Sequence, residues 1–289
     1  VSVKQISVER KTSRVSYNEI NSDTRIKWGQ AYDDFTKRLS MARFKSIVFD
    51  YDGTLCDPAE RYTTLSKVIV LQLMRFLESG IFIGIATGRG KSVRESLCKS
   101  LGKSYMDKVL IAYYNGSDIS LLSNSDSPKL DNPVDKTISK LNDELNKNWW
   151  FKELANHEMR PCQITIVPRK VSFWNATKTH TYTLCKRLST SLQILESTHS
   201  IDVIPAGVTK AALFKHLKYP VLSIGDKGAW PGNDYDLLAS EYSLSVNEVS
   251  AEYRDCWNIA PAGFRGTQAT LFYLNRMKFA KEAFRFILK

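Results

Sequence analysis

Apolar residues along the chain gather in short runs, and each run is followed by a turn rich in glycine and polar residues. Runs at 47–49, 81–86, 109–113 and 221–224 have the length and the branched side chains of buried strands. Helical patterns lie between them. Strands that alternate with helices form parallel sheets with right-handed crossovers. The pattern therefore predicts an α/β fold whose core is a Rossmann-like parallel sheet.

The spacing of apolar positions predicts where the helices lie. Repeats of three and four residues indicate helices at about 58–79 and 92–101, each after a strand of the core. A further amphipathic helix is predicted at 28–39. The last stretch, 267–289, has basic residues among apolar ones and is predicted to be a basic amphipathic helix.

The segment between the third and fourth strands has a different texture. Helices are predicted there at 134–145 and 179–188, and extended segments at 163–167, 171–174 and 192–195. We interpret this segment as a smaller α+β cap domain inserted into the core. The predicted division is an N-terminal extension with a short helix at 1–42, a core made of 43–116 and 203–289, and a cap at 117–202.

Net charge is the unusual feature of the composition. The 289 residues are 43% hydrophobic and 25% charged, as in globular proteins, and carry a net charge of +11. Residues 46–262 hold 25 basic and 24 acidic residues, whereas 1–45 hold 10 and 5 and 263–289 hold 6 and 1. The excess therefore lies in the two terminal segments. It predicts contact there with a partner protein, a fused domain or nucleic acid.

Two observations bear on location. The five cysteines are scattered without any short pair spacing, which argues against a disulfide framework or a zinc site and favours reduced thiols in the cytoplasm. Charged and polar residues interrupt the longest apolar stretch, so no membrane segment or membrane partner is expected.

Candidate chemistry begins with Asp50-Tyr-Asp52-Gly-Thr after the first strand. Two carboxylates two residues apart at a strand end can serve one reacting centre, one as a nucleophile toward phosphorus and the other as the acid that protonates the leaving group. The alternative is an Asp-Gly turn that caps the next helix. The motif alone leaves both interpretations open.

Three more polar groups follow predicted strands. Thr87-Gly88-Arg89 can hold phosphate oxygens with a hydroxyl and backbone amides, although glycine turns are common without function. Lys210 opens a helix and can neutralise phosphate charge, or it is a solvated lysine. A loop from Gly225 to Asp234 carries Asp226 and Asn233, which are oxygen ligands of the kind that Mg²⁺ prefers, or simply turn residues. The carboxyl ends of parallel strands share one edge, where such sheets bind ligands. The four groups together therefore favour the functional interpretation.

With these motifs, 44–248 resembles the haloacid dehalogenase-like phosphohydrolase superfamily. Asp50 to Thr54, Thr87, Lys210 and the Asp226–Asp234 loop match its four motifs in order. Asn115-Gly116, followed by a long insertion, is similar to the subgroup with a large α/β cap. Within it, the loop Gly225-Asp-Lys to Pro-Gly-Asn-Asp is similar to that of eukaryotic-type phosphomannomutases.

The resemblance implies a role for each matched residue. Asp50 is the nucleophile that forms an aspartyl-phosphate, Asp52 is the general acid and then base, and Thr87 and Lys210 hold the phosphoryl oxygens. Mg²⁺ is implied as the cofactor, with metal-site residues Asp50, Asp52, Asp226, Asn233 and Asp234. The candidate substrate-binding residues are Gly88, Arg89, Asn115, Arg160 and Arg169, the two cap arginines being a loose match to those with which mutases hold a second phosphate.

These observations predict a phosphoric monoester hydrolase. The leading hypothesis is a Mg²⁺-dependent phosphatase that acts on a small phosphorylated metabolite, a sugar phosphate or a nucleotide. One alternative is a phosphosugar mutase that returns the phosphoryl group to its substrate. The other is a regulatory or nucleic-acid-associated domain of a larger assembly.

Overall fold

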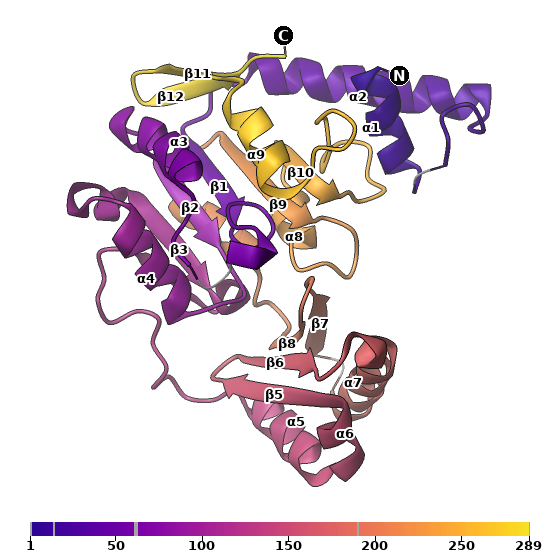
Figure 1. Cartoon of the computed structure of the whole chain (residues 1–289), viewed down its shortest axis with the longest axis vertical. Helices are drawn as coiled ribbons and strands as arrows, with labels where there is room; N and C mark the ends of the chain where they lie inside the picture. The colour runs from indigo at the N-terminus through magenta and orange to yellow at the C-terminus, as the bar shows by residue number, and fades with distance from the viewer. Residues whose placement is uncertain (1, 14, 61–62, 190, 289) are drawn as a thin grey trace.

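Two large sheets of different kinds build most of the molecule, and a two-stranded hairpin near the C-terminus forms a third (Figure 1). The structure is a computed structural model that describes residues 2–13, 15–60, 63–189 and 191–288. The larger, six-stranded sheet lies in the upper part of Figure 1, and a four-stranded sheet with its helices lies below it. Two chain segments connect the parts, one before and one after the smaller sheet. The predicted α/β fold with a Rossmann-like core and a separate cap sheet is confirmed.

The six-stranded sheet is parallel except at one edge. Its order is β10-β9-β1-β2-β3-β4, and only β4 runs antiparallel to its neighbour. In that order the strands are Ser243–Glu248, Val221–Lys227, Ser46–Asp50, Phe82–Ala86, Val109–Tyr113 and Asp118–Leu121. β1 and β3 are buried along their whole length, as expected for central parallel strands covered on both faces. Strand β1, next to β2 and β9, therefore places Asp50 at the middle of the sheet edge.

Four helices accompany this sheet: α3 Lys67–Glu78, α4 Lys91–Ser100, α8 Tyr235–Leu238 and α9 Gly266–Leu274. The helix predicted to begin at about residue 58 starts later. Ser66 caps α3, its hydroxyl accepting the Ile69 amide over 3.5 Å, and the residues at 58–60 form a short 3-10 turn instead. Residues 61–62 of that prediction lie outside the described residues. The N-cap serine explains the later start, because it satisfies an amide of the first turn.

The cap sheet is antiparallel in the order β5-β6-β8-β7, with strands Ala155–Arg160, Gln163–Pro168, Ile201–Pro205 and Leu192–Glu196. Three helices pack with it: α5 Lys136–Lys147, α6 Trp149–Leu154 and α7 Trp174–Leu188. Their shared core contains Ile138, Leu141, Phe151, Ile164 and Val203, all fully buried. This separate core makes the cap a packed unit of its own.

The strand predicted at 171–174 is wrong. A 3-10 turn, Val171–Phe173, leads there into helix α7. Val171 is 94% exposed, so its apolar side chain marks no buried face. The buried side of α7 includes Thr177, Thr181 and Leu184, at helical spacing. Because two of these buried positions are threonines, the apolar residues alone do not show the helical period at the start of α7.

Two predicted domain boundaries differ from the sheets. β4, Asp118–Leu121, pairs with β3 in the core sheet, although 117 onward was predicted to be cap. β8, Ile201–Pro205, pairs with β6 and β7 in the cap sheet, so the boundary predicted between 202 and 203 falls inside a strand. By strand pairing, the inserted segment runs from after Leu121 to Pro205.

The N-terminal segment forms two helices, α1 Val3–Lys11 and α2 Ser22–Met41, at the end of the core away from the cap (Figure 1). The helix predicted at 28–39 lies within α2. The helix predicted at 267–289 is wrong beyond Leu274. A hairpin of β11 Met277–Ala280 and β12 Ala283–Phe286 follows instead, and Phe44 forms a bridge with Phe284. In β12, Phe284 and Phe286 are buried and Arg285 between them is exposed, which is the period of a strand rather than of a helix.

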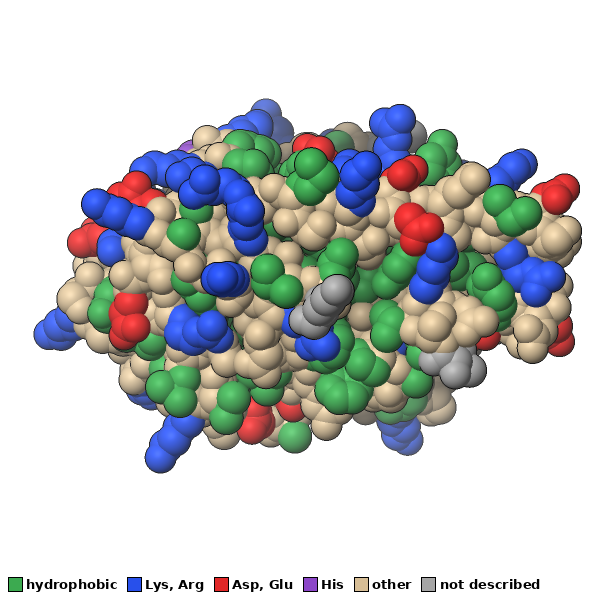
Figure 2. All heavy atoms as spheres, turned by 90° about the horizontal axis from the view of Figure 1, so that it is seen from above, with side chains coloured by type: hydrophobic (Ala, Val, Ile, Leu, Met, Phe, Trp, Pro, Cys, Tyr) green, Lys and Arg blue, Asp and Glu red, His purple; other side chains and the backbone are tan. Residues whose placement is uncertain are grey.

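Part of the terminal positive charge is used inside the molecule. Lys11 is buried and donates to the carbonyl oxygens of Ser250, Glu252 and Asp255. Arg10 donates to several acceptors at 258–261, among them the Ala260 carbonyl at 2.6 Å. Both side chains hold α1 against a loop far away in sequence. Figure 2, which views the α2 end of the molecule, shows the remaining Lys and Arg side chains dispersed among acidic and hydrophobic ones.

Candidate active site

Three of the predicted site residues meet because their strands end at the same edge of the core sheet. Asp50 ends β1, Thr87 follows β2, and Asp226 is the next-to-last residue of β9. β1 lies between the other two strands, so its carboxylate is central. Asp50, Thr87 and Asp226 are all buried. The sheet therefore brings together residues that are up to 176 positions apart (226 − 50).

Lys210 connects two carboxylates below this edge. It opens the short 3-10 helix 210–216, and Thr209 caps that helix by accepting the Ala211 amide. Its Nζ donates to Asp50 Oδ1 over 2.5 Å and to Asp234 Oδ1 over 2.7 Å. All three side chains are almost completely buried. A buried ammonium between two carboxylates stays charged only because both partners compensate its desolvation.

The pKa values reflect this burial. Burial and the nearby charge of Asp234 raise the pKa of Asp50 to about 8, against the opposing effect of Lys210. Burial, Asp50 and Asp234 also raise the pKa of Asp226 well above its usual range. Burial opposes ionisation of Asp234, but Lys210 outweighs it and holds the pKa of Asp234 low. Asp234 is thus the ionised partner of the lysine, and Asp50 and Asp226 crowd each other.

This crowding fits a divalent cation. Oxygens of Asp50, Asp226 and Asp234 lie within 4.8 Å of one another. Asp50 Oδ2 and Asn233 Oδ1 are buried and accept no hydrogen bond from the described residues. Such oxygens are costly to bury unless they bind something. All these donors are oxygens, which suits Mg²⁺.

Asp234 differs from the other predicted metal-site residues. Its Oδ2 accepts the backbone amides of Asp226 and Lys227 over 2.9 and 3.1 Å, while its Oδ1 accepts from Lys210. Both oxygens are therefore engaged. The carboxylate of Asp226 packs closely against Gly53, because a Cβ at position 53 would lie 2.4 Å from Asp226 Oδ2. The φ of +84° at Gly53 also favours glycine.

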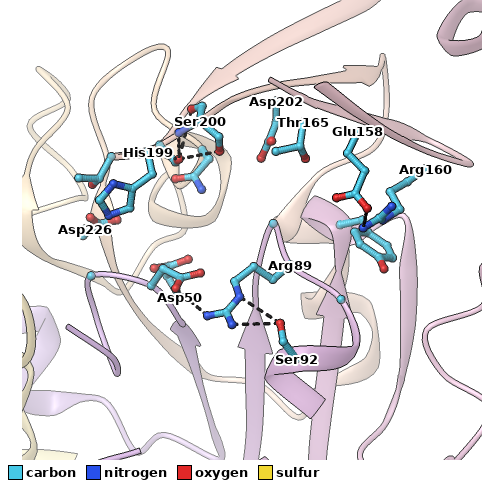
Figure 3. Close-up of a pocket in the computed structure, with 18 residues that line it drawn as sticks. Asp50, Arg89, Ser92, Glu158, Arg160, Thr165, His199, Ser200, Asp202 and Asp226 are labelled. Carbon is cyan, nitrogen blue, oxygen red and sulfur yellow. Dashed lines mark hydrogen bonds and ion pairs between the residues drawn. The ribbon is translucent and has the colours of Figure 1, made fainter. Parts of the chain in front are cut away.

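A pocket of about 220 Å³ opens above Asp50 and is lined by both sheets' residues (Figure 3). On the core side, Asp52 Oδ1 accepts from Arg89 over 3.0 Å, and Ser92 accepts from the same guanidinium. Figure 3 shows Arg89 pointing toward Asp50 from below. The predicted general acid is thus held at the pocket floor by an arginine of the second motif.

Cap side chains close the pocket from the opposite side. Glu158 and Arg160 form an ion pair at one end, with the Arg160 guanidinium 5.7 Å from the centre of the Tyr114 ring. Thr165 and Asp202, from neighbouring cap strands, lie between this pair and the loop at Ser200 (Figure 3). The cap half of the pocket is therefore polar and carries both signs of charge.

The structure places the other predicted substrate-binding residues differently. Gly88, Arg89 and Arg160 line the pocket. Arg169 does not: its Nε donates to the Lys152 carbonyl oxygen over 2.7 Å, outside the pocket that the described residues form. Asn115 is fully buried beside the pocket and donates to the cap residues Gln163 and Asp202. Sequence patterns do not indicate Glu158, Gln163 and Asp202, because isolated polar residues in strands carry no motif.

Comparison with known proteins addresses the family. A family model described as haloacid dehalogenase-like hydrolase matches residues 47–152. Residues 47–152 are therefore similar to this family of hydrolases. The predicted superfamily and the predicted class of enzyme, a phosphoric monoester hydrolase, agree with this match. No curated protein matches the sequence.

Several solved structures share the fold of this chain. The IMP-bound IMP-nucleotidase of Plasmodium falciparum has a TM-score of 0.53 at 12% identity, over 85% of this chain and 76% of that chain. The C-terminal domain of trehalose-6-phosphate phosphatase from Candida albicans has a TM-score of 0.53 at 16% identity, over 86% and 95%. The structure of Thermoplasma acidophilum 0175 has a TM-score of 0.50 at 15% identity, over 72% of this chain and 87% of that chain. At these identities the likeness concerns the fold.

No helix among the described residues is long and apolar enough to cross a membrane.

Proposed function

We propose that this chain is a Mg²⁺-dependent phosphatase that hydrolyses a small phosphorylated metabolite through an aspartyl-phosphate on Asp50. The observation that carries the proposal is the buried set of Asp50, Lys210 and Asp234 below a polar pocket that core and cap enclose. Two of the three similar structures named above are a nucleotidase and a trehalose-6-phosphate phosphatase, and both names are consistent with this class of reaction.

The reaction assigns one step to each carboxylate. The ionised carboxylate of Asp50 attacks phosphorus, and the bond to the leaving oxygen breaks as Asp52 gives that oxygen a proton. Asp52 then takes a proton from a water molecule, whose oxygen attacks phosphorus and releases inorganic phosphate and Asp50. Lys210 holds charge beside Asp50 throughout, and Arg89 keeps Asp52 at the pocket floor. The balance is one ester and one water converted to one alcohol and one phosphate.

Mg²⁺ would be held by Asp50, Asp226 and Asn233, with the backbone carbonyl of Asp52 as a further oxygen. When bound, the ion neutralises negative charge on the phosphoryl group during transfer. Asp234 would support this site by holding Lys210 and the amides at the end of β9. The Thr87 hydroxyl and the Gly88 amide would hold phosphoryl oxygens, while the Arg89 amide donates to Thr87 Oγ1.

A phosphatase is favoured over a mutase by the cap. A mutase must hold a second phosphate, and of the two cap arginines assigned that role only Arg160 lines the pocket, where Glu158 already neutralises it. Contact with a partner protein, a fused domain or nucleic acid through the basic terminal segments stays a prediction. Cytoplasmic location also stays a prediction.

A screen tests the proposed function. Wild-type protein is incubated with phosphorylated metabolites and oligonucleotides, with and without Mg²⁺, and released phosphate is measured. The expected result is Mg²⁺-dependent release from small metabolites that Asp50→Asn abolishes. Release from oligonucleotide ends alone would favour the nucleic-acid alternative, and absence of release from every compound would contradict the proposal.

A further inference from the structure

One cap side chain reaches into the core beside the active site. Gln163, the first residue of β6, is fully buried. Its Nε2 donates to the Gly88 carbonyl oxygen over 3.1 Å and to Thr165 Oγ1 over 2.7 Å, and its Oε1 accepts from Asn115 Nδ2 over 3.0 Å. Gly88 and Asn115 lie in the turns after β2 and β3. Gln163 therefore joins the cap to both turns.

The contact with Gly88 fixes one peptide plane. The Gly88 carbonyl and the Arg89 amide belong to the same planar peptide group. Gln163 holds the carbonyl at one end, and Thr87 Oγ1 accepts the Arg89 amide at the other over 3.0 Å. Rotation of this peptide would break both bonds together. The cap thus restrains the turn whose Thr87 hydroxyl and Gly88 amide are assigned to the phosphoryl oxygens.

Asn115 strengthens the same junction from the core side. Its backbone lies in the left-handed region, with φ +56°, which asparagine tolerates better than most residues. Its amide N–H donates to the Thr87 carbonyl over 2.8 Å, and its Nδ2 also donates to Asp202 Oδ2 over 3.0 Å. Asp202 faces Thr165 in the β6–β8 pair. Two adjacent cap strands are therefore bonded to one core residue.

The cap comes close enough here to need a glycine. A Cβ at position 88 would lie 2.9 Å from Asp202 Oδ2. At the other side of the pocket, the Glu196 amide donates to the Pro231 carbonyl over 2.9 Å, and its carbonyl accepts the Asn233 amide over 3.1 Å. The cap is thus seated at the turn after β2 and at the loop that carries Asn233.

We propose that Gln163 is a positioning residue that orders the Thr87–Gly88–Arg89 turn only while the cap is seated on the core. Cap seating and completion of the phosphate-binding turn are then one event. This inference rests on the proposed function for its catalytic consequence, whereas the ordering of the turn is a property of the structure alone.

The test compares two isosteric changes in two different strands of the cap sheet. Gln163→Met keeps the side-chain volume and removes both hydrogen-bonding ends, while Asp202 still accepts from Asn115. Gln193→Met is the matched control, because Gln193 lies in β7 of the same sheet and does not line the pocket. Amide hydrogen exchange is followed by mass spectrometry at 87–90 and in the cap strands, and phosphate release is measured in parallel.

We expect Gln163→Met to accelerate exchange at 87–90 about tenfold or more, with unchanged exchange in the cap strands, and to lower kcat about 10- to 100-fold. Gln193→Met leaves both unchanged. Unaltered exchange at 87–90 overturns the proposal, and so does equal acceleration throughout the cap sheet, which marks a merely structural role. Should Gln163→Met fail to fold, Gln163→Glu retains the acceptor, loses the donor to Gly88 when ionised, and must give the same local acceleration.

The two proposals fail in different ways. If wild-type protein releases phosphate from no compound but Gln163→Met still loosens the turn selectively, the proposed function is wrong and the ordering by Gln163 stands. If wild-type protein is active and Gln163→Met matches it in exchange and kcat, the phosphatase stands and the positioning role is wrong.

Discussion

Asp234 holds Lys210 with one carboxylate oxygen, over 2.7 Å, and holds the end of strand β9 with the other. The same lysine reaches Asp50 over 2.5 Å. The nucleophile, the cation and the strand that carries Asp226 are therefore parts of one buried network. Because each side chain of the network is a hydrogen-bond or ion-pair partner of another, removal of one leaves a buried charge without its partner.

Removing the lysine tests that network. Lys210→Met leaves Asp50 and Asp234 without their buried cation, and breaking such a pair costs about 3–5 kcal/mol of unfolding free energy. Urea denaturation near neutral pH measures the loss. Lys215→Met in the same short helix is the control, because Lys215 is exposed and its removal changes stability by about 0.5 kcal/mol or less. Equal effects of the two changes would contradict the network.

Stabilisation by Mg²⁺ should depend on pH. In the metal-free protein the pKa of Asp50 is about 8, above its unfolded value, so folding takes up a proton. This contribution to stability is present at low pH and is lost as pH rises toward 8. Mg²⁺ needs the ionised carboxylates and therefore binds more strongly at higher pH. The Tm increase caused by Mg²⁺ is expected to be larger at pH 8 than at about pH 6.

Thermal denaturation with and without Mg²⁺ checks this expectation. Asp226→Asn removes one predicted oxygen ligand and should abolish most of the increase at pH 8. A Tm increase that is the same at both pH values, or that survives in Asp226→Asn, would argue against a metal held by these carboxylates.

Loss of the general acid should depend on the leaving group. Asp52→Asn cannot protonate the departing oxygen, which matters most for alkyl and sugar phosphates and least for activated aryl phosphates. We expect kcat/KM for an alkyl phosphate to fall about 10²- to 10⁴-fold and that for an aryl phosphate to fall less. Asp57→Asn is the control, since Asp57 accepts from Thr267 and does not line the pocket. Equal losses for both substrates would remove Asp52 from this role.

The two cap arginines should behave differently. Arg160 lines the pocket and Arg169 donates to a carbonyl outside it. Arg160→Met is expected to raise KM about tenfold, equivalent to about 1.4 kcal/mol of binding, whereas Arg169→Met leaves KM nearly unchanged.

A hexose 1-phosphate supplied with a hexose bisphosphate should release phosphate without forming the 6-phosphate. Formation of that isomer, together with sensitivity to Arg169→Met, would establish the mutase instead.

The sequence predicts those elements whose burial shows in the pattern of their own apolar residues. Strand β3 was predicted with its observed bounds because every residue of it is apolar and buried. Helix α1 was not predicted, because its contact with the core depends on Arg10 and Lys11 bonding carbonyls about 240 residues away. The hairpin after Leu274 was mistaken for a helix for a similar reason. Its strand β12 is joined through Phe284 to Phe44, a contact between segments far apart in the sequence.

Motifs made the core half of the candidate site accessible to prediction. Asp50, Thr87, Lys210 and Asp226 each follow or open an element, so strand order alone indicates that they meet. The cap half lacked such markers. Gln163 and Asp202 reach the site because β6 pairs with β8, a contact between segments that are separated by a helix and a further strand.

The central claim is that Asp50 becomes covalently phosphorylated. The most direct measurement uses a phosphate ester that the wild-type protein hydrolyses. Wild-type protein and Asp52→Asn are each mixed with this ester and Mg²⁺ and quenched in acid, and the phosphoryl group is located by peptide mass spectrometry. We expect a phosphoryl group on Asp50, which accumulates in Asp52→Asn and is absent from Asp50→Asn. A phosphoryl group on another residue, or turnover by Asp50→Asn near the wild-type rate, would contradict it.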